Sequence, residues 1–187
     1  AALYGAFAAE LVRSRTMRRR FTPDRFSVSG VLQVMNTILH ERQLEEYYCT
    51  LCYAFFDFKA HTVTISNSGL PYPIRCTKDA CDQIELPGVP LGSFPGVTYD
   101  EITLPLRKGD LFVFCSDGIF ETMNEDGQEF GAQRLCDVVR EYRHQNAREI
   151  VDAIFDAATA FQRGAPRHDD MTAVAVKIIG KGEVKSA

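Results

Sequence analysis

The feature of this chain that most constrains its fold is a short apolar run, Leu111–Cys115, followed at once by Ser116, Asp117 and Gly118. An apolar run of this length predicts a β-strand that is buried on both faces, so the fold must place layers around it. Gly118 allows the backbone to turn sharply where this strand leaves the core. The Asp117 carboxylate is therefore expected at the end of a buried strand, where it needs a partner.

The order of the other patterns predicts the α+β class. Helical and alternating apolar spacings predict helices first, then many antiparallel strands, then helices again and one final strand. The expected helices cover residues 1–20, 29–43, 132–142 and 148–161, and the expected strands cover 48–57, 61–67, 72–76, 83–86, 98–106, 111–115 and 172–179. This order does not alternate as βαβ units do, and a sandwich of two antiparallel β-sheets flanked by α-helices fits it best.

Charge and hydropathy exclude two classes of partner. The formal net charge is −4, whereas general nucleic-acid binding requires a basic surface. No apolar run approaches the ~18 residues that a membrane-spanning helix needs. We therefore expect no nucleic-acid partner and no membrane span in this segment, while the oligomeric state stays open.

The six cysteines have three possible interpretations: disulfides, zinc ligands or reduced thiols. Cysteines in apolar runs behave as small hydrophobic residues; these are Cys52, Cys115 and Cys136. The pairs Cys49/Cys52 and Cys76/Cys81 have spacings that resemble a zinc site, but positions three apart in a strand face opposite sides. We predict reduced thiols in a cytoplasmic protein. A zinc-stabilised binding module remains an alternative.

Several catalytic motifs are absent from the sequence. There is no P-loop, no GxGxxG for a dinucleotide, no GxSxG nucleophile elbow and no HExxH. No cysteine is followed six positions later by arginine, so the loop of the cysteine phosphatases is missing as well. The chemistry that remains is that of acidic residues at strand ends.

A second pair of acids, Asp169 and Asp170, directly precedes the strand expected at 172–179. If that strand lies antiparallel beside Leu111–Cys115, Asp117 and Asp169 converge at one edge of the sheet. Clustered carboxylates are the ligands of hard divalent ions such as Mg²⁺ and Mn²⁺. Asp-Gly is also a common turn dipeptide, and two acids before a strand can form a simple polar loop. Spacing alone leaves both interpretations open.

The run from Gly109 to Glu121 resembles the GD…(S/T)DG(V/I)xE segment of the metal-dependent (PPM-type) Ser/Thr protein phosphatases, most of all their bacterial SpoIIE-like branch. Other blocks are similar to the family's NAGHxPP, (G)xPLG, FGxxRL and DDxT motifs, and they occur in family order. These blocks are Asn67–Pro73, Leu86–Gly92, Phe130–Leu135 and Asp169–Thr172. We expect one SpoIIE-like domain over residues 1–179 and a polar tail over 180–187.

The resemblance implies a centre of two Mn²⁺ or Mg²⁺ ions at one edge of a β-sandwich. Asp117 and Asp169 would be metal ligands, and Asp170 would be an outer-shell ligand or a partner that orients Asp169. His168 is a candidate for binding the substrate phosphate, although a loop histidine without a role is an equal alternative. A metal-activated water would attack phosphorus without a covalent intermediate, in agreement with the missing nucleophile motifs.

The chain departs from the family pattern at two places. It opens at Ala1-Ala2-Leu3, which resembles the helix start that follows the family's D-V-x-G-x-G block. The bridging Asp of that block and the first strands are therefore expected upstream of Ala1, and without them we expect the 187 residues alone to be inactive. Leu70 stands where the family usually has His. The basic run Arg13–Arg20 is either a solvated helix end or a docking surface for an acidic partner.

The expected activity is the hydrolysis of phosphoserine or phosphothreonine on a partner signalling protein, such as an anti-sigma-factor antagonist. The domain would belong to a larger bacterial protein with upstream sensor domains. The alternative is a non-catalytic phosphatase-like scaffold that binds regulatory partners.

Overall fold

The computed structural model describes residues 27–41, 48–166 and 169–180. The helix expected at residues 1–20, with its basic run, lies outside these residues, as does the tail from residue 181. The chain divides into two compact units, which are described separately. Unit 1 comprises Ala1–Phe56, Val63–Leu70 and Leu86–Leu104, and unit 2 comprises Asp57–Thr62, Pro71–Glu85 and Pro105–Ala187.

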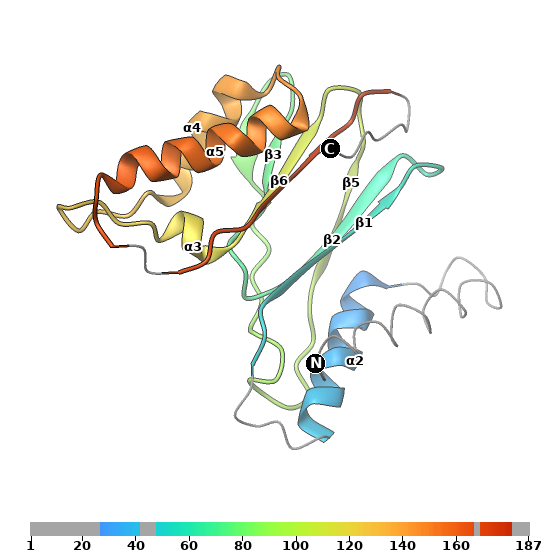
Figure 1. Cartoon of the computed structure of the whole chain (residues 1–187). Coiled ribbons are helices and arrows are strands. Elements are labelled where there is room, and N and C mark those ends of the chain that lie inside the picture. The colour runs from blue at the N-terminus through green and yellow to red at the C-terminus, as the bar shows by residue number, and fades with distance from the viewer. Residues whose placement is uncertain (1–26, 42–47, 167–168, 181–187) are drawn as a thin grey trace. The chain divides into compact units, whose positions relative to one another are not determined.

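The elements follow the predicted order closely (Figure 1). The helices are α2 (Val28–Glu41), α3 (Asp117–Phe120), α4 (Gly131–Tyr142) and α5 (Ala147–Gln162). The strands are β1 (Leu51–Asp57), β2 (Thr62–Ser68), β3 (Ile74–Cys76), β4 (Cys81–Gln83), β5 (Glu101–Pro105), β6 (Leu111–Cys115) and β7 (Ala173–Lys177). They form two sheets, in the orders β1-β2-β5 and β4-β3-β6-β7. The α+β class with two antiparallel sheets is confirmed.

Unit 1 is built on the sheet β1-β2-β5, against which α2 packs. Leu32 of α2 is fully buried, together with Val31, Met35 and Leu39 of the same helix face. Asn36 is buried on this face as well, and its side chain holds the loop before β5. Its Nδ2 donates to the Phe94 carbonyl at 2.9 Å, and its Oδ1 accepts from the Gly92 N–H at 2.8 Å.

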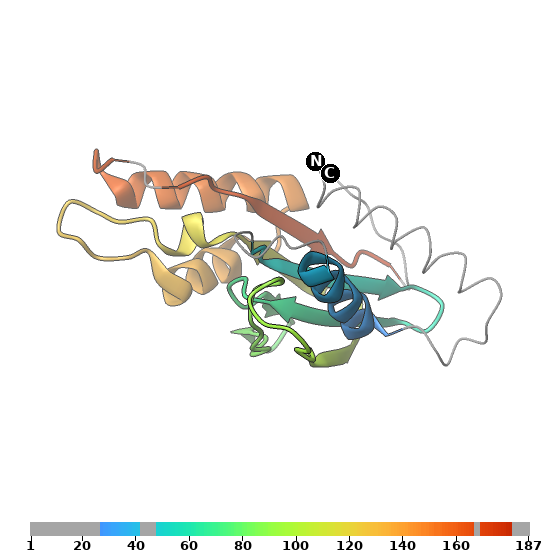
Figure 2. The same ribbon diagram turned by 90° about the horizontal axis from the view of Figure 1, so that it is seen from below.

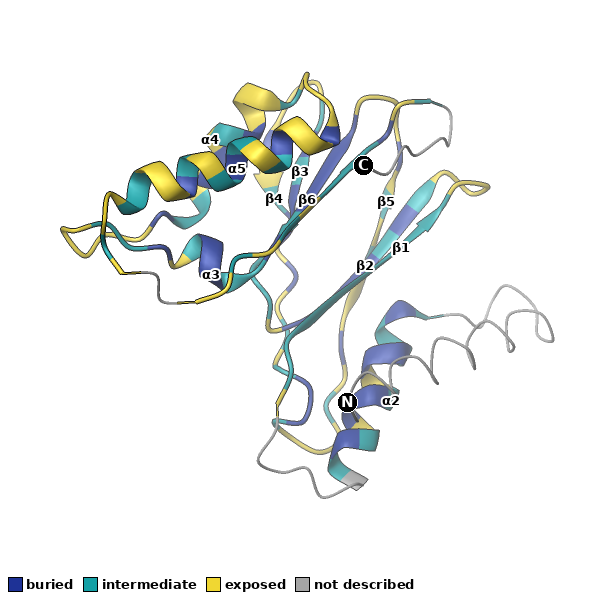
Figure 3. Cartoon of the chain, viewed as in Figure 1, coloured by how far each residue is buried: buried dark blue, intermediate teal, exposed yellow. Residues whose placement is uncertain are grey.

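Unit 2 is built on the sheet β4-β3-β6-β7, in which all three strand pairs are antiparallel. Helices α4 and α5 pack against this sheet, as the two views in Figures 1 and 2 agree. Their sheet-facing residues are buried and their outer residues are exposed (Figure 3). The core contains Leu135 and Val139 of α4, Ile150 and Ile154 of α5, and Val113 of β6. Strand β6 is buried almost throughout, as predicted.

Helix α5 begins at a capping box. The Asn146 side chain accepts from the Glu149 N–H at 3.0 Å, and the Glu149 carboxylate accepts from the Asn146 N–H at 2.9 Å. These two bonds satisfy backbone donors that the first turn of a helix otherwise leaves unpaired. Among the described residues, no helix is long and apolar enough to span a membrane.

The cysteine prediction is wrong for one pair. Cys76 of β3 and Cys81 of β4 stand directly opposite each other in the antiparallel register and form a disulfide. Four other cysteines are free, namely Cys49, Cys52, Cys115 and Cys136. Because Cys76 and Cys81 bond to each other, the interpretation that pairs them with Cys49 and Cys52 around zinc fails.

Candidate metal centre

Strands β6 and β7 bring the two predicted acidic segments to the same edge of the sheet. The strands are antiparallel, with Cys115 opposite Ala173. Asp117 follows the end of β6, and Asp169 precedes the start of β7. Two antiparallel neighbours place the end of one strand beside the start of the other. The sequence predicted that Asp117 and Asp169 converge if these two strands are antiparallel neighbours. The structure meets that requirement.

Ser116 extends the pairing of these strands by one residue. Its backbone N–H donates to the Thr172 carbonyl at 3.0 Å. Its hydroxyl accepts from the Thr172 N–H at 2.9 Å and donates to the Asp170 carbonyl at 3.2 Å. One serine thus ties the backbone before Asp117 to the backbone that carries Asp169 and Asp170.

Gly118 occupies a position where a side chain does not fit. A Cβ atom built there would stand 2.3 Å from the Asp170 carbonyl oxygen and 3.4 Å from the Asp169 Cβ. The two segments are therefore in direct contact just beyond the strands. Gly118 was predicted to let the backbone turn sharply, and the structure adds this close approach, which a single sequence cannot reveal.

Local hydrogen bonds orient two of the three carboxylates. The Gly118 N–H donates to Asp117 Oδ1 at 3.0 Å, and the Asp170 N–H donates to Asp169 Oδ1 at 2.7 Å. Asp117 is half-buried at the start of α3, whereas Asp169 and Asp170 are exposed. Helix α3 is a single turn that the sequence did not predict. Glu121 ends that turn and, with Asp169, lines a hollow of about 70 Å³.

The carboxylates of Asp117, Asp169 and Asp170 are the type of ligand that binds a hard divalent ion. The described residues alone do not form a complete set of ligands. Carboxylate oxygens suit Mg²⁺ and Mn²⁺, and each carboxylate can accept several bonds at once. Within the described ranges, no group of three or more His, Cys, Asp or Glu side chains is arranged to hold a metal ion. His168 lies outside the described residues, so its candidate role stays a prediction.

Residues of two further motif-like segments, Asn67–Pro73 and Leu86–Gly92, contact each other inside unit 1. Asn67 is buried, and its Nδ2 donates to the carbonyls of Leu70 and Leu86, at 2.8 and 3.1 Å. A Cβ at Gly88 would stand 2.0 Å from the Asn67 carbonyl oxygen. These contacts join the unit 1 part of the first block, Asn67–Leu70, to the Leu86–Gly92 block, and they give both segments a structural role within unit 1.

The sequence matches a family model over residues 6–179, and the model describes stage II sporulation protein E (SpoIIE). The chain belongs to the SpoIIE family. The match includes all the acids discussed above, from Asp117 to Asp170. The resemblance stated from the sequence motifs is thereby confirmed.

One curated relative is the phosphoserine phosphatase RsbU of Bacillus subtilis (strain 168). It is 28% identical over 153 residues, which are 80% of this chain and 44% of RsbU. The stage II sporulation protein E of the same organism is 24% identical over 148 residues, which are 79% of this chain and 17% of that protein. This SpoIIE chain thus spans less than half the length of either relative.

Solved structures confirm the fold of this SpoIIE-family chain. The SiaA-PP2C domain of Pseudomonas aeruginosa superposes with a TM-score of 0.74 at 17% identity, over 95% of this chain and 68% of that one. The catalytic domain of the serine threonine protein phosphatase PstP, in complex with two manganese ions, superposes with a TM-score of 0.60 at 11% identity. That match covers 94% of this chain and 82% of PstP. At these identities the likeness concerns the fold alone.

Proposed function

We propose that this chain is the catalytic domain of a metal-dependent protein phosphatase that hydrolyses phosphoserine or phosphothreonine on a partner protein. The observation that carries the proposal is the convergence of Asp117 and Asp169 at one edge of the β6–β7 pair, in a chain of the SpoIIE family. RsbU, a relative that is 28% identical to this chain, is named a phosphoserine phosphatase, which supports the same reaction class here.

In this proposal Asp117 and Asp169 are direct ligands of Mn²⁺ or Mg²⁺, with two ions in the complete site. Asp170 acts as a positioning residue, because its N–H donates to the Asp169 carboxylate. The Gly118 N–H holds Asp117 in the same way. Bound divalent ions would supply Lewis-acid activation of a water molecule and of the phosphate oxygens. The chain's own part is to hold two carboxylates, from segments about fifty residues apart, in a fixed relation.

The partner in this proposal is a phosphorylated signalling protein, and an anti-sigma-factor antagonist is one candidate. Regulation would come from sensor domains in the same protein, acting in the cytoplasm.

The test is Mn²⁺-dependent hydrolysis of a phosphoserine peptide by the 187-residue chain and by a longer version extended at its N-terminus. Asp117→Asn in the active version should abolish turnover and weaken Mn²⁺ binding in a calorimetric titration. Asp152→Asn is the matched control, because the Asp152 side chain is 60% exposed on α5 and pairs with the exposed Arg148 at 3.6 Å. A folded longer chain that hydrolyses no phosphopeptide would overturn the proposal and favour the scaffold alternative.

A further inference from the structure

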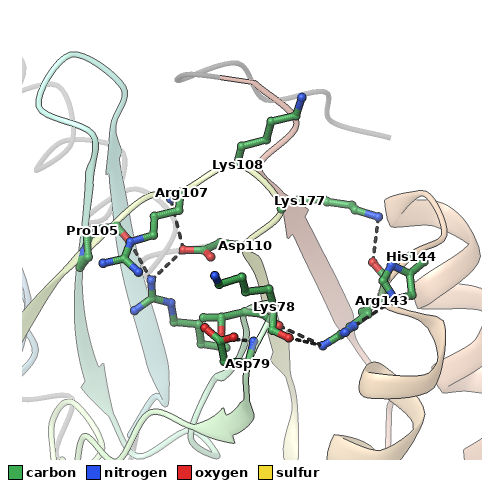
Figure 4. Close-up of a pocket in the computed structure, with 12 residues that line it drawn as sticks. Lys78, Asp79, Pro105, Arg107, Lys108, Asp110, Arg143, His144 and Lys177 are labelled. Atoms are coloured by element: carbon green, nitrogen blue, oxygen red, sulfur yellow. Dashed lines mark hydrogen bonds and ion pairs between the residues drawn. The ribbon is translucent and has the colours of Figure 1, made fainter.

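A second polar site lies in unit 2, at the end of the sheet opposite to the acidic edge. It is a cavity of about 380 Å³, within the size range of pockets that hold small molecules. Three regions form its wall: the turn between β3 and β4, the loop that leads into β6, and the residues that follow α4 (Figure 4). Lys177, the last residue of β7, closes the wall.

The lining of this cavity is strongly basic although the chain as a whole is acidic. Six Lys or Arg side chains and two Asp line it, a formal net charge of +4 with His144 neutral, against −4 for the chain. The six basic residues are Arg75, Lys78, Arg107, Lys108, Arg143 and Lys177. Charges of one sign gathered in a concave site raise the local concentration of ions of the opposite sign.

Among the described residues, one ion pair neutralises part of this positive charge. Asp110 is 4% exposed and pairs with Arg75 at 2.7 Å. Arg143 donates instead to the carbonyls of Thr77 and Lys78, at 3.1 and 3.2 Å. Carbonyl partners position a guanidinium without cancelling its charge. Arg143 is thereby anchored without a carboxylate partner among the described residues.

The other basic side chains of the cavity likewise have no carboxylate hydrogen-bond or ion-pair partner recorded among the described residues. Lys177 donates to the carbonyls of Arg143 and Gln145, and burial lowers its pKa, against an opposing influence of Glu149. For the side chains of Lys78, Arg107 and Lys108, the described part of the structure records no carboxylate partner. In addition, the Nε of Arg75 is buried without a hydrogen-bond partner there.

We propose that this cavity binds a small polyanion, a molecule that carries two or more phosphate groups. The volume exceeds what one phosphate needs, and the cations stand on separate segments, so several anionic groups can each find donors. Among the described residues that line the cavity there is no Phe, Tyr or Trp, which disfavours recognition of a nucleotide through base stacking. The sequence analysis did not single out this site, because its residues are scattered between positions 75 and 177.

This site is separate from the proposed metal centre. Asp110 precedes β6 and Ser116 follows it, and a strand rises about 3.3 Å per residue, so roughly 20 Å of strand lies between the two ends. A binding measurement in metal-free buffer therefore tests the cavity independently of phosphatase activity.

The experiment is a calorimetric titration of the chain with pyrophosphate in the presence of a chelator, with amide NMR shifts as a map. We expect saturable one-site binding, with shifts confined to residues 75–79, 105–110, 143–145 and 177. Arg107→Gln with Lys108→Gln should weaken binding by about tenfold or more, because two charged donors are lost. Both residues are exposed in a turn, so the fold should persist.

The matched control is Lys59→Gln with Arg148→Gln, which removes two exposed charges of the same unit away from the cavity. It should change affinity by less than about twofold. Equal weakening by both double variants would mean diffuse attraction to the whole surface and would overturn the proposal, as would the absence of saturable binding. Displacement of pyrophosphate by a poly-glutamate peptide of higher affinity would overturn it in favour of an acidic protein segment.

Discussion

Gly118 lies so close to Asp170 that a Cβ atom at position 118 would stand 2.3 Å from the Asp170 carbonyl oxygen. This distance is shorter than any stable contact between a methyl carbon and an oxygen. The backbone that follows β6 and the backbone that precedes β7 therefore pack without a side chain between them. The spacing of the two acidic segments depends on this contact.

The first prediction concerns Gly118→Ala. We expect the substitution to lower the free energy of unfolding by about 1–3 kcal/mol, because a backbone carbonyl must move to admit the methyl group. Urea unfolding measures the change. Gly30→Ala in α2 is the control, since a Cβ there meets Ser27 only at 3.4 Å. The close packing would be refuted by equal stability of Gly118→Ala and the parent chain.

The second prediction concerns Ser116→Ala. Loss of the hydroxyl removes the bonds to the Thr172 N–H and to the Asp170 carbonyl. We expect a loss of about 1–2 kcal/mol in unfolding free energy, and a decrease of about tenfold in Mn²⁺ affinity of the catalytically competent chain. Ser116→Thr, which keeps the hydroxyl, should restore most of the affinity. A decrease in stability without any change in Mn²⁺ affinity would restrict Ser116 to a structural role.

The third prediction concerns the ion pair between Arg75 and Asp110. The two side chains are 17% and 4% exposed and their charged atoms are 2.7 Å apart. Arg75→Met or Asp110→Asn alone should cost about 3 kcal/mol, because each leaves a buried charge uncompensated. The double variant should cost clearly less than the sum of the two single changes.

The exposed pair of Arg148 and Asp152 is the control for this cycle. Its members are 78% and 60% exposed and 3.6 Å apart, so its coupling energy should stay below about 0.5 kcal/mol. Urea unfolding of the four chains in each cycle gives both coupling energies. Similar values for the two pairs would show that burial adds nothing to the Arg75–Asp110 interaction.

The fourth prediction concerns alkaline pH. Burial raises the pKa of the Cys115 thiol from its ordinary value of 9.0 to about 12. Above pH 9 the unfolded chain loses this proton while the folded chain keeps it. The free energy of unfolding should therefore decrease as pH rises from 9 towards 12, by about 1.4 kcal/mol per pH unit for this thiol.

Urea unfolding between pH 8 and pH 10.5 measures this contribution. In Cys115→Ala the decrease above pH 9 should be smaller than in the parent chain. Val113→Ala is the matched control, because it truncates a buried side chain of the same strand without removing an ionisable group. If Cys115→Ala and Val113→Ala show the same pH dependence, the thiol does not titrate in the way described.

Much of unit 2 could be predicted from the sequence because its central strand is apolar throughout. The bounds of β6 agree with the predicted range, and β7 differs only at its ends. The predicted ends of α4 and α5 each differ from the observed ends by at most one residue, because the apolar spacing of both helices is regular. The pairing of β6 with β7, stated beforehand only as a condition, then located Asp117 and Asp169.

The short elements were harder to predict, because neighbouring segments decide their ends. Strand β4 was expected at residues 83–86 but occupies Cys81–Gln83. The turn after β3, in which the Thr77 N–H donates to the Ala80 carbonyl, places Cys81 opposite Cys76. That register brings the two thiols together, and no periodicity in the sequence expresses it. The single turn α3 is too short for helical spacing to be detected.

The hydrogen bond from the Ser116 N–H to the Thr172 carbonyl closes a long excursion of the chain. The segment that contains α3, α4 and α5 connects β6 to β7, which is the neighbouring strand of the sheet. The two strands therefore form an antiparallel pair with a long helical connection in place of a short turn. The β6–β7 register therefore brings together acidic segments that lie about fifty residues apart in the sequence, so the acidic edge exists only in the folded chain.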